Sequence, residues 1–178
     1  MASDVEKNDL ERILAMVTGA RSIVLIDGRS GSGKTELATE LAASLEAQLV
    51  RLDHLYPGWG GLEAGSERVR TDILLANRWQ RWDWAWGAHA EWHELDPSRA
   101  LIVEGSGALS SANRELATLG VWVELDEPTR KARALARDGA MYEPHWDAWA
   151  AQEQRFFERE RPDLLADVVV GSVESSAS

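Results

Sequence analysis

Short apolar runs alternate with longer segments of helical periodicity along the chain. The apolar runs that predict β-strands are residues 22–27, 47–52, 99–105, 120–125 and 167–170. Apolar residues at helical spacing predict helices over 4–18, 34–45, 65–76, 109–119, from Pro128 onward, and over about 145–159. Strands that alternate with helices in this way indicate an α/β fold.

The first apolar run leads directly into a glycine-rich loop, between a predicted strand and a predicted helix. The loop reads Gly28-Arg29-Ser30-Gly31-Ser32-Gly33-Lys34-Thr35, which matches the Gly-x-x-x-x-Gly-Lys-Thr pattern of a phosphate-binding loop. Its glycines allow positive φ angles, so several N–H groups can point into one concavity, and the helix adds its own unpaired N–H groups. We therefore predict that these residues bind nucleotide phosphates, with Lys34 on the β- and γ-phosphates and Thr35 on Mg²⁺. The alternative is a glycine-rich turn without a ligand.

Two carboxylates follow the second and third apolar runs. Ligands of open α/β sheets bind at the carboxyl ends of the strands, so Asp53 and Glu104 should lie near the mouth of the loop. Asp53 would orient, or accept the proton of, a substrate hydroxyl that attacks the γ-phosphate. Glu104 would hold Mg²⁺ through water or bind a substrate hydroxyl. The alternatives are a turn or helix-capping role for Asp53 and a structural role for Glu104.

Five of the nine tryptophans lie within residues 77–94. Trp82, Trp84 and Trp86 alternate, so a short extended segment would place them on one side. We expect most of these rings to pack a small satellite core. A sharper hypothesis is that one or two rings, Trp84 or Trp59 first, form a wall of the acceptor pocket. Histidines 89 and 93 have helical metal-site spacing but no recognisable third ligand, so we expect them to bind no metal.

Three arginines form one stripe of the helix that begins near Pro128. Arg130, Arg133 and Arg137 are spaced i, i+3 and i+7. Guanidinium groups suit phosphate oxygens, and a closing segment can bring them to a phosphoryl group that is being transferred. We therefore predict a lid over about 130–145, with a solvated charged face as the alternative.

Composition narrows the class of protein. The chain has 178 residues, a net charge of −11 and no cysteine. This length suits one domain, which we place at 1–172, with a tryptophan-rich insertion at about 54–94 and a polar tail at 173–178. The acidic charge argues against a nucleic-acid partner, and no apolar run approaches a membrane span. The missing cysteines exclude disulfides, and the first residues do not resemble a signal peptide. We expect a cytoplasmic protein that is a monomer or homodimer, without a membrane partner.

Four motifs in this order resemble those of P-loop small-molecule kinases of the uridine kinase and nicotinamide riboside kinase type. They are Gly-x-Ser-Gly-Ser-Gly-Lys-Thr at 28–35, Asp-x-Leu-Tyr at 53–56, Val-Glu-Gly at 103–105, and Arg-Asp at 137–138 on the lid helix. Asp83-Trp84 is also similar to the substrate-side segment of such kinases. The resemblance implies a five-stranded parallel sheet of order 2-3-1-4-5, with helices on both faces and an arginine-bearing lid.

The resemblance also implies ATP and Mg²⁺ as cofactors and a small-molecule acceptor. Lys34 and Thr35 would bind ATP–Mg²⁺, and Arg133 and Arg137 would bind the phosphates. Asp53 would be the catalytic base or a hydroxyl ligand. Glu104 would lie near the acceptor hydroxyls and the metal, and Tyr56 would lie in the acceptor pocket. We add Trp59, Arg81 and Trp84 as candidate substrate-binding residues.

Three functions fit these observations. The first is an ATP-dependent kinase that phosphorylates a hydroxyl of a small polar metabolite, with a nucleoside or similar molecule favoured. The second is a nucleoside monophosphate kinase, in which Arg51, Arg78 and Arg81 could bind the acceptor phosphate. The third is a nucleotide-binding regulatory P-loop ATPase. The chain has no Asn-Lys-x-Asp guanine signature, which argues against a GTPase.

Overall fold

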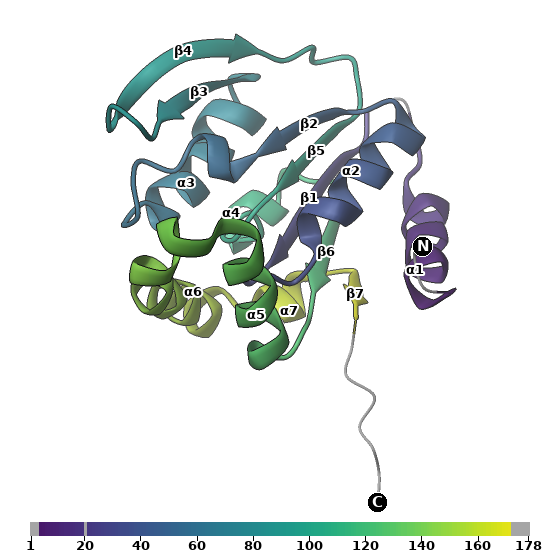
Figure 1. The fold of residues 1–178 in the computed structure, drawn as a ribbon. Helices are drawn as coiled ribbons and strands as arrows, with labels where there is room; N and C mark the ends of the chain where they lie inside the picture. The colour runs from purple at the N-terminus through teal and green to yellow at the C-terminus, as the bar shows by residue number, and fades with distance from the viewer. Residues whose placement is uncertain (1–3, 20, 172–178) are drawn as a thin grey trace, which may run out of the picture.

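A five-stranded parallel sheet forms the centre of the computed structural model, which describes residues 4–19 and 21–171 (Figure 1). Its strands are β1 (Ile23–Gly28), β2 (Gln48–Arg51), β5 (Leu101–Glu104), β6 (Leu119–Val123) and β7 (Val168–Val170). Their order is β2-β5-β1-β6-β7, and each neighbouring pair is parallel. Counted within this sheet alone, that order is 2-3-1-4-5, so the predicted topology is confirmed.

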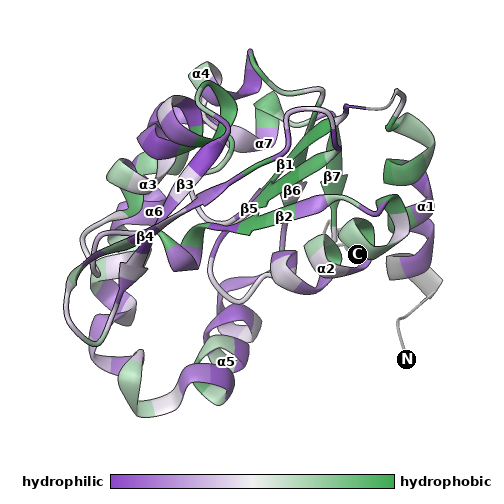
Figure 2. Cartoon of the chain, turned by 90° about the horizontal axis from the view of Figure 1, so that it is seen from above, coloured by the Kyte–Doolittle hydropathy of each residue, from purple (hydrophilic) through white to green (hydrophobic). Residues whose placement is uncertain are grey.

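Helices cover both faces of the sheet. On one face, α1 (Asp4–Met16) and α2 (Lys34–Leu45) pack on the even-numbered residues of β1, so that Ile13 and Leu41 share a core with Val24 and Ile26. On the other face, Leu25 packs with residues of α3 (Leu62–Arg68) and α6 (Trp146–Glu160). Apolar residues are concentrated in the central strands (Figure 2). This alternation follows from the two-residue side-chain period of a strand.

Two predicted helices differ in the structure. The helix predicted over 65–76 begins earlier, as α3, and continues as the π-helix η2 (Val69–Leu74). The helix predicted over 109–119 is reduced to α4 (Ser111–Arg114), with a short α7 (Pro162–Leu165) nearby. The reason is that Thr118 already pairs with Ile23 of β1 through its N–H and its hydroxyl, so the chain must be extended there and enter β6.

The insertion predicted at about 54–94 contains α3 and η2 and ends in an antiparallel hairpin separate from the main sheet (Figure 1). The hairpin consists of β3 (Arg78–Asp83) and β4 (Ala88–Glu94). Trp82 lies on β3, but Trp84 and Trp86 lie in the turn, so the predicted extended alternation over 82–86 is wrong. Asp83 causes the turn, because its carboxylate accepts hydrogen bonds from the main-chain N–H groups of residues 85 and 86.

The predicted lid is α5 (Glu127–Asp138) with two single turns, η3 (Gly139–Met141) and η4 (Glu143–His145), that lead into α6. Asp126 caps α5 by accepting a hydrogen bond from the Thr129 N–H at 3.0 Å. The predicted tail at 173–178 lies outside the described residues. Within the described ranges, none of the helices has both the length and the apolar character needed to cross a membrane.

Candidate active site

The loop between β1 and α2 has the shape of a phosphate cradle. Gly31 and Gly33 have φ angles of +80° and +97°, which L side chains rarely adopt. Gly33 is the N-cap of α2 and supplies no side-chain hydrogen bond, so the first N–H groups of the helix remain available to an anion. A Cβ on Gly28 would lie 2.7 Å from the Val123 carbonyl oxygen, and one on Gly31 would collide with the Arg130 carbonyl.

A cavity of about 170 Å³ lies between this loop and α5. Its lining residues come from the loop, the start of α2 and one face of α5: Gly31, Gly33, Lys34, Thr35, Glu36, Arg133, Ala134 and Arg137. We refer to it as the phosphate cavity. It brings Lys34 and Thr35 together with two of the three predicted lid arginines, as a site for several phosphate oxygens requires.

A hydroxyl and a carboxylate form the predicted metal site beside this cavity. The Thr35 hydroxyl donates a hydrogen bond to Glu104 Oε1 at 3.1 Å. Glu104 is only 2% exposed, and burial raises its pKa, although the positive charge of Lys34 opposes this. Both groups offer the oxygen ligands that Mg²⁺ prefers, so the residues present fit this ion. Among the described residues, there is no group of three or more His, Asp or Glu side chains that could hold a metal ion.

A second cavity, of about 570 Å³, lies on the other side of Arg137. Its lining consists mainly of aromatic and charged residues: Ser30, Asp53, Tyr56, Trp59, Trp84, Arg137, Asp138, Met141, Tyr142, His145 and Trp149. We refer to it as the acceptor cavity. Arg137 lines both cavities, and the acceptor cavity also reaches Ser30 of the glycine-rich loop. The two cavities are therefore neighbours.

Asp53 reaches the acceptor cavity from η1 (Leu52–His54), the single helical turn that follows β2. Tyr56 lies nearby but is 1% exposed, and its hydroxyl donates to the Ser106 carbonyl oxygen at 2.6 Å. Burial raises the pKa of Tyr56. Its ring therefore forms part of the cavity floor, and its hydroxyl is already engaged within the protein.

Aromatic stacking joins the lid to the loop after β2. The ring of Trp59 stacks on His145, with centroids 4.3 Å apart, and lies 5.4 Å from the nearly parallel ring of Tyr142. The ring centroid of Trp84 lies 5.1 Å from that of Trp59. The Tyr142 hydroxyl donates to Ser30 Oγ at 2.8 Å. The lid thus contacts both the glycine-rich loop and the wall of the acceptor cavity.

Two buried carboxylates support the loop from behind. Glu153 of α6 accepts hydrogen bonds from the Ser30 N–H, the Ser106 hydroxyl and the Trp149 indole N–H. Asp27 accepts main-chain hydrogen bonds from residues 28, 107 and 109, while burial raises its pKa to about 7. These contacts fix the end of β1 and the loop to the segment between β5 and α4 and to α6.

The three arginines of the predicted lid helix do not all face the phosphate cavity. Arg133 and Arg137 line the phosphate cavity, but Arg130 is 5% exposed and lies behind the loop. Its guanidinium donates to the carbonyl oxygens of Leu125 and Ser30. Arg130 therefore fastens α5 to the loop and is not positioned as a phosphate ligand.

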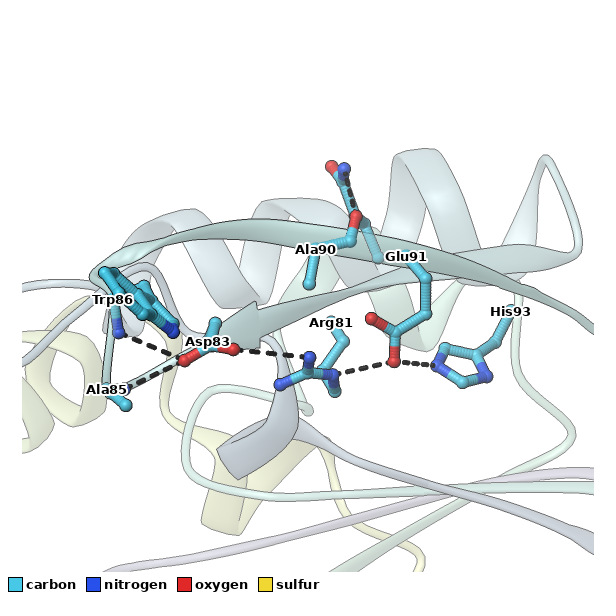
Figure 3. A network of polar contacts seen from close by, with 8 residues as sticks. Arg81, Asp83, Ala85, Trp86, Ala90, Glu91 and His93 are labelled. Atoms are coloured by element: carbon cyan, nitrogen blue, oxygen red, sulfur yellow. Dashed lines mark hydrogen bonds and ion pairs between the residues drawn. The ribbon is translucent and has the colours of Figure 1, made fainter.

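Two predicted substrate-binding residues, Glu104 and Arg81, are absent from the lining of the acceptor cavity. Glu104 is hydrogen-bonded to Thr35 instead. Arg81 lies on β3. Its guanidinium contacts Glu91 at 2.7 Å and Asp83 at 3.4 Å within the hairpin (Figure 3). The prediction of Arg81 in the acceptor pocket is corrected for this reason. Sequence reasoning missed Tyr142, His145, Trp149 and Glu153. The aromatic spacing along 142–149 was a visible signal, but nothing in it indicated contact with Trp59.

No protein-family model matches the sequence, and no curated protein matches it. Solved structures do match. A possible uridine kinase from Bacillus stearothermophilus matches with a TM-score of 0.63 and 21% identity over 94% of this chain and 97% of the other. A provisionally named fructose transport system kinase from Silicibacter sp. TM1040 matches with a TM-score of 0.53 and 19% identity over 94% and 99%. Shikimate kinase from Acinetobacter baumannii, in complex with shikimate, matches with a TM-score of 0.52 and 14% identity over 86% and 85%. The chain has the fold of P-loop small-molecule kinases.

Proposed function

We propose that this protein is an ATP- and Mg²⁺-dependent kinase that transfers the γ-phosphate to a hydroxyl group of a small polar metabolite, with a nucleoside or similar molecule as the favoured acceptor. The observation that carries the proposal is the adjacency of the two cavities. Lys34 and Thr35 line the phosphate cavity, Asp53 lines the acceptor cavity, and Arg137 lines both. Phosphoryl transfer needs this arrangement, because its catalysis consists largely of positioning and electrostatic stabilisation.

The roles follow from the positions of the side chains. The loop N–H groups and Lys34 would bind the β- and γ-phosphates, and Arg133 and Arg137 would stabilise charge on the oxygens of the transferred group. Thr35 and Glu104 would hold Mg²⁺, which neutralises phosphate charge when it is bound.

Asp53 would accept a hydrogen bond from the acceptor hydroxyl and take its proton as the new P–O bond forms and the bond to ADP breaks. ADP leaves as the second product, and the proton passes from Asp53 to water.

The acceptor cavity favours an unphosphorylated acceptor over a nucleoside monophosphate. Arg51 donates to Thr39 Oγ at 2.9 Å, and the Arg78 guanidinium lies 4.4 Å from the centre of the Trp92 ring. Like Arg81, neither residue is among those that line the acceptor cavity, where Arg137 is the only lysine or arginine among the described residues. Arg137 also lines the phosphate cavity, so the acceptor cavity offers no arginine or lysine of its own for a second phosphate group. The cavity also argues against a regulatory ATPase, which needs no second pocket of this kind beside Asp53.

A coupled ADP-release assay tests the proposal. Purified protein with ATP and Mg²⁺ is given nucleosides, sugars, amino alcohols or nucleoside monophosphates, and a Lys34→Ala variant serves as the inactive control. We expect ADP release only with an added unphosphorylated acceptor. Turnover with monophosphates alone would favour the second function. ADP release that is independent of every acceptor would contradict the proposal and favour the regulatory ATPase.

A further inference from the structure

The β3–β4 hairpin contacts the turn that carries Asp53 at two points. The Trp84 indole N–H donates a hydrogen bond to the main-chain carbonyl oxygen of Asp53 at 2.9 Å. The next residue, His54, stacks on Trp79 with ring centroids 6.2 Å apart, and Trp79 stacks on His93 of the opposite strand at 4.2 Å. Two adjacent residues of η1 are therefore held by one hairpin.

These contacts matter because η1 is a single turn. Its internal support comes from the N–H groups of Leu55 and Tyr56, both of which donate to the Leu52 carbonyl oxygen. Among the described residues, no side chain or main-chain group hydrogen-bonds the Asp53 carboxylate. The place of the carboxylate in the cavity thus depends on the backbone that carries it, and the Trp84 hydrogen bond restrains that backbone from 31 residues away.

We propose that the hairpin positions Asp53 through Trp84, whose indole N–H holds the Asp53 carbonyl while its ring forms part of the acceptor cavity wall. This inference rests on the proposed function, since it treats Asp53 as the group that receives the acceptor hydroxyl. Trp84 is then a positioning residue for Asp53 and, through its ring, a contact for the acceptor. Because one side chain performs both tasks, the carboxylate and the cavity wall keep a fixed relation to each other.

A polar network centred on Asp83 holds the turn in which Trp84 lies, and Figure 3 shows the contacts of Asp83 with Ala85, Trp86 and Arg81. Asp83 Oδ1 accepts from the N–H groups of Ala85 and Trp86 at 3.0 and 3.1 Å, and the Asp83 carbonyl accepts from the Gly87 N–H at 2.7 Å. These bonds fix the turn of residues 84–87, in which Trp84 is the first residue.

Arg81 holds the other oxygen of Asp83 and also pairs with Glu91 across the hairpin. This pairing lowers the pKa of Glu91 to about 2, so the carboxylate stays charged at any physiological pH. Exposed ion pairs contribute little to stability, so we assign this network a geometric role: it orients the turn that presents Trp84. Arg81 would therefore act on the site indirectly, by holding Asp83, and not by binding the acceptor.

Trp86 provides a matched control in the same turn. Its side chain is 85% exposed, whereas that of Trp84 is 40% exposed, and it does not line the acceptor cavity. Trp84→Phe keeps an aromatic wall but removes the N–H donor. Trp86→Phe makes the same chemical change where we expect no contact with Asp53. Trp84→Ala removes both the donor and the wall.

The test combines steady-state kinetics with hydrogen exchange measured by mass spectrometry. We expect Trp84→Phe to lower kcat about fivefold with nearly unchanged KM values, as the loss of one neutral hydrogen bond predicts. Trp84→Ala should also raise the acceptor KM. Peptides covering residues 52–56 should exchange about fivefold faster in Trp84→Phe than in Trp86→Phe, while peptides covering 101–104 stay unchanged.

Kinetics and exchange that match the wild type in Trp84→Phe would overturn the inference. Should the wild type phosphorylate no acceptor at all, the proposed function fails, and hydrogen exchange alone decides whether Trp84 restrains the turn. Faster exchange at 52–56 would then support the restraint, and unchanged exchange would refute it.

Discussion

Replacing Gly31 by alanine probes how closely α5 rests on the glycine-rich loop. Gly31 has a φ of +80°, a conformation that costs an L-residue about 1–2 kcal/mol. The new Cβ would also collide with the main-chain carbonyl of Arg130 on α5. Backbone cannot rotate aside as a side chain can, so overpacking adds about 1–3 kcal/mol. We expect Gly31→Ala to lower the free energy of unfolding by about 3 kcal/mol in total.

Two other glycines separate backbone strain from collision. Gly58 has a φ of +81°, and a Cβ there meets no atom within 4 Å. Gly33 has a φ of +97°, and its Cβ would lie 3.5 Å from the flexible end of Arg133, which is ordinary contact. Both alanine variants should therefore lose only the strain term of about 1–2 kcal/mol.

Urea unfolding of the ligand-free variants, followed by circular dichroism, measures these differences. Calorimetric titration with ATP should show weakened binding in Gly31→Ala and Gly33→Ala but not in Gly58→Ala, because only the first two line the phosphate cavity. Equal destabilisation by Gly31→Ala and Gly58→Ala would refute the reasoning, since it would mean that α5 does not rest on the loop.

Three further predictions concern buried or shared charges. Burial raises the pKa of Asp27 from 3.8 to about 7. Between about pH 4 and pH 7 the native state therefore keeps a proton that the unfolded state has lost, and the free energy of unfolding should fall by up to about 4 kcal/mol as pH rises through this range. Unfolding curves of Asp27→Asn should lack this slope, and an identical slope in the variant would contradict the prediction. Glu153→Ala leaves the Ser30 N–H and the Trp149 indole N–H without an acceptor, whereas the Ser106 hydroxyl can still donate to the Gly28 carbonyl oxygen. We expect a cost of about 3 kcal/mol in urea unfolding, while the exposed Glu158→Ala on the same helix should cost almost nothing. Arg137→Ala should lower kcat at least about 100-fold with a much smaller loss of ATP affinity by calorimetry, and a loss confined to affinity would place Arg137 outside the transfer step.

The sheet was predictable because its signals are local. Each strand is a short apolar run, and the glycine pattern at 28–35 requires a strand before it and a helix after it. The resemblance then supplied the strand order. The placement of Asp53 and Glu104 near the loop follows from the rule that the carboxyl ends of parallel strands share one edge.

The remaining features depend on contacts that no local pattern contains. Periodicity favours a long helix over 109–119, but pairing between Thr118 and β1 limits it to α4. The Trp82–Trp84–Trp86 alternation resembles a strand, but the Asp83 carboxylate closes a turn. The stripe of lid arginines does not reveal that Arg130 is buried behind the loop.

Four residues predicted for the acceptor pocket do line the cavity, namely Asp53, Tyr56, Trp59 and Trp84. The residues that the lid and α6 contribute depend on long-range packing. Trp59 and His145 are far apart in sequence, and only the folded lid stacks them at 4.3 Å. Arg81 was a candidate because an arginine on the substrate side could bind an acceptor phosphate, but strand pairing brings Glu91 within 2.7 Å of it. In each case a partner distant in sequence decided the role of the side chain.

Comparison of the wild type with Asp53→Asn tests the central claim most directly. Acceptor-dependent ADP release is measured for both proteins, and ATP affinity is measured in parallel by calorimetry. The account predicts that Asp53→Asn binds ATP normally but no longer phosphorylates the acceptor, because the amide cannot take the proton of the hydroxyl. Wild-type turnover in Asp53→Asn would contradict it.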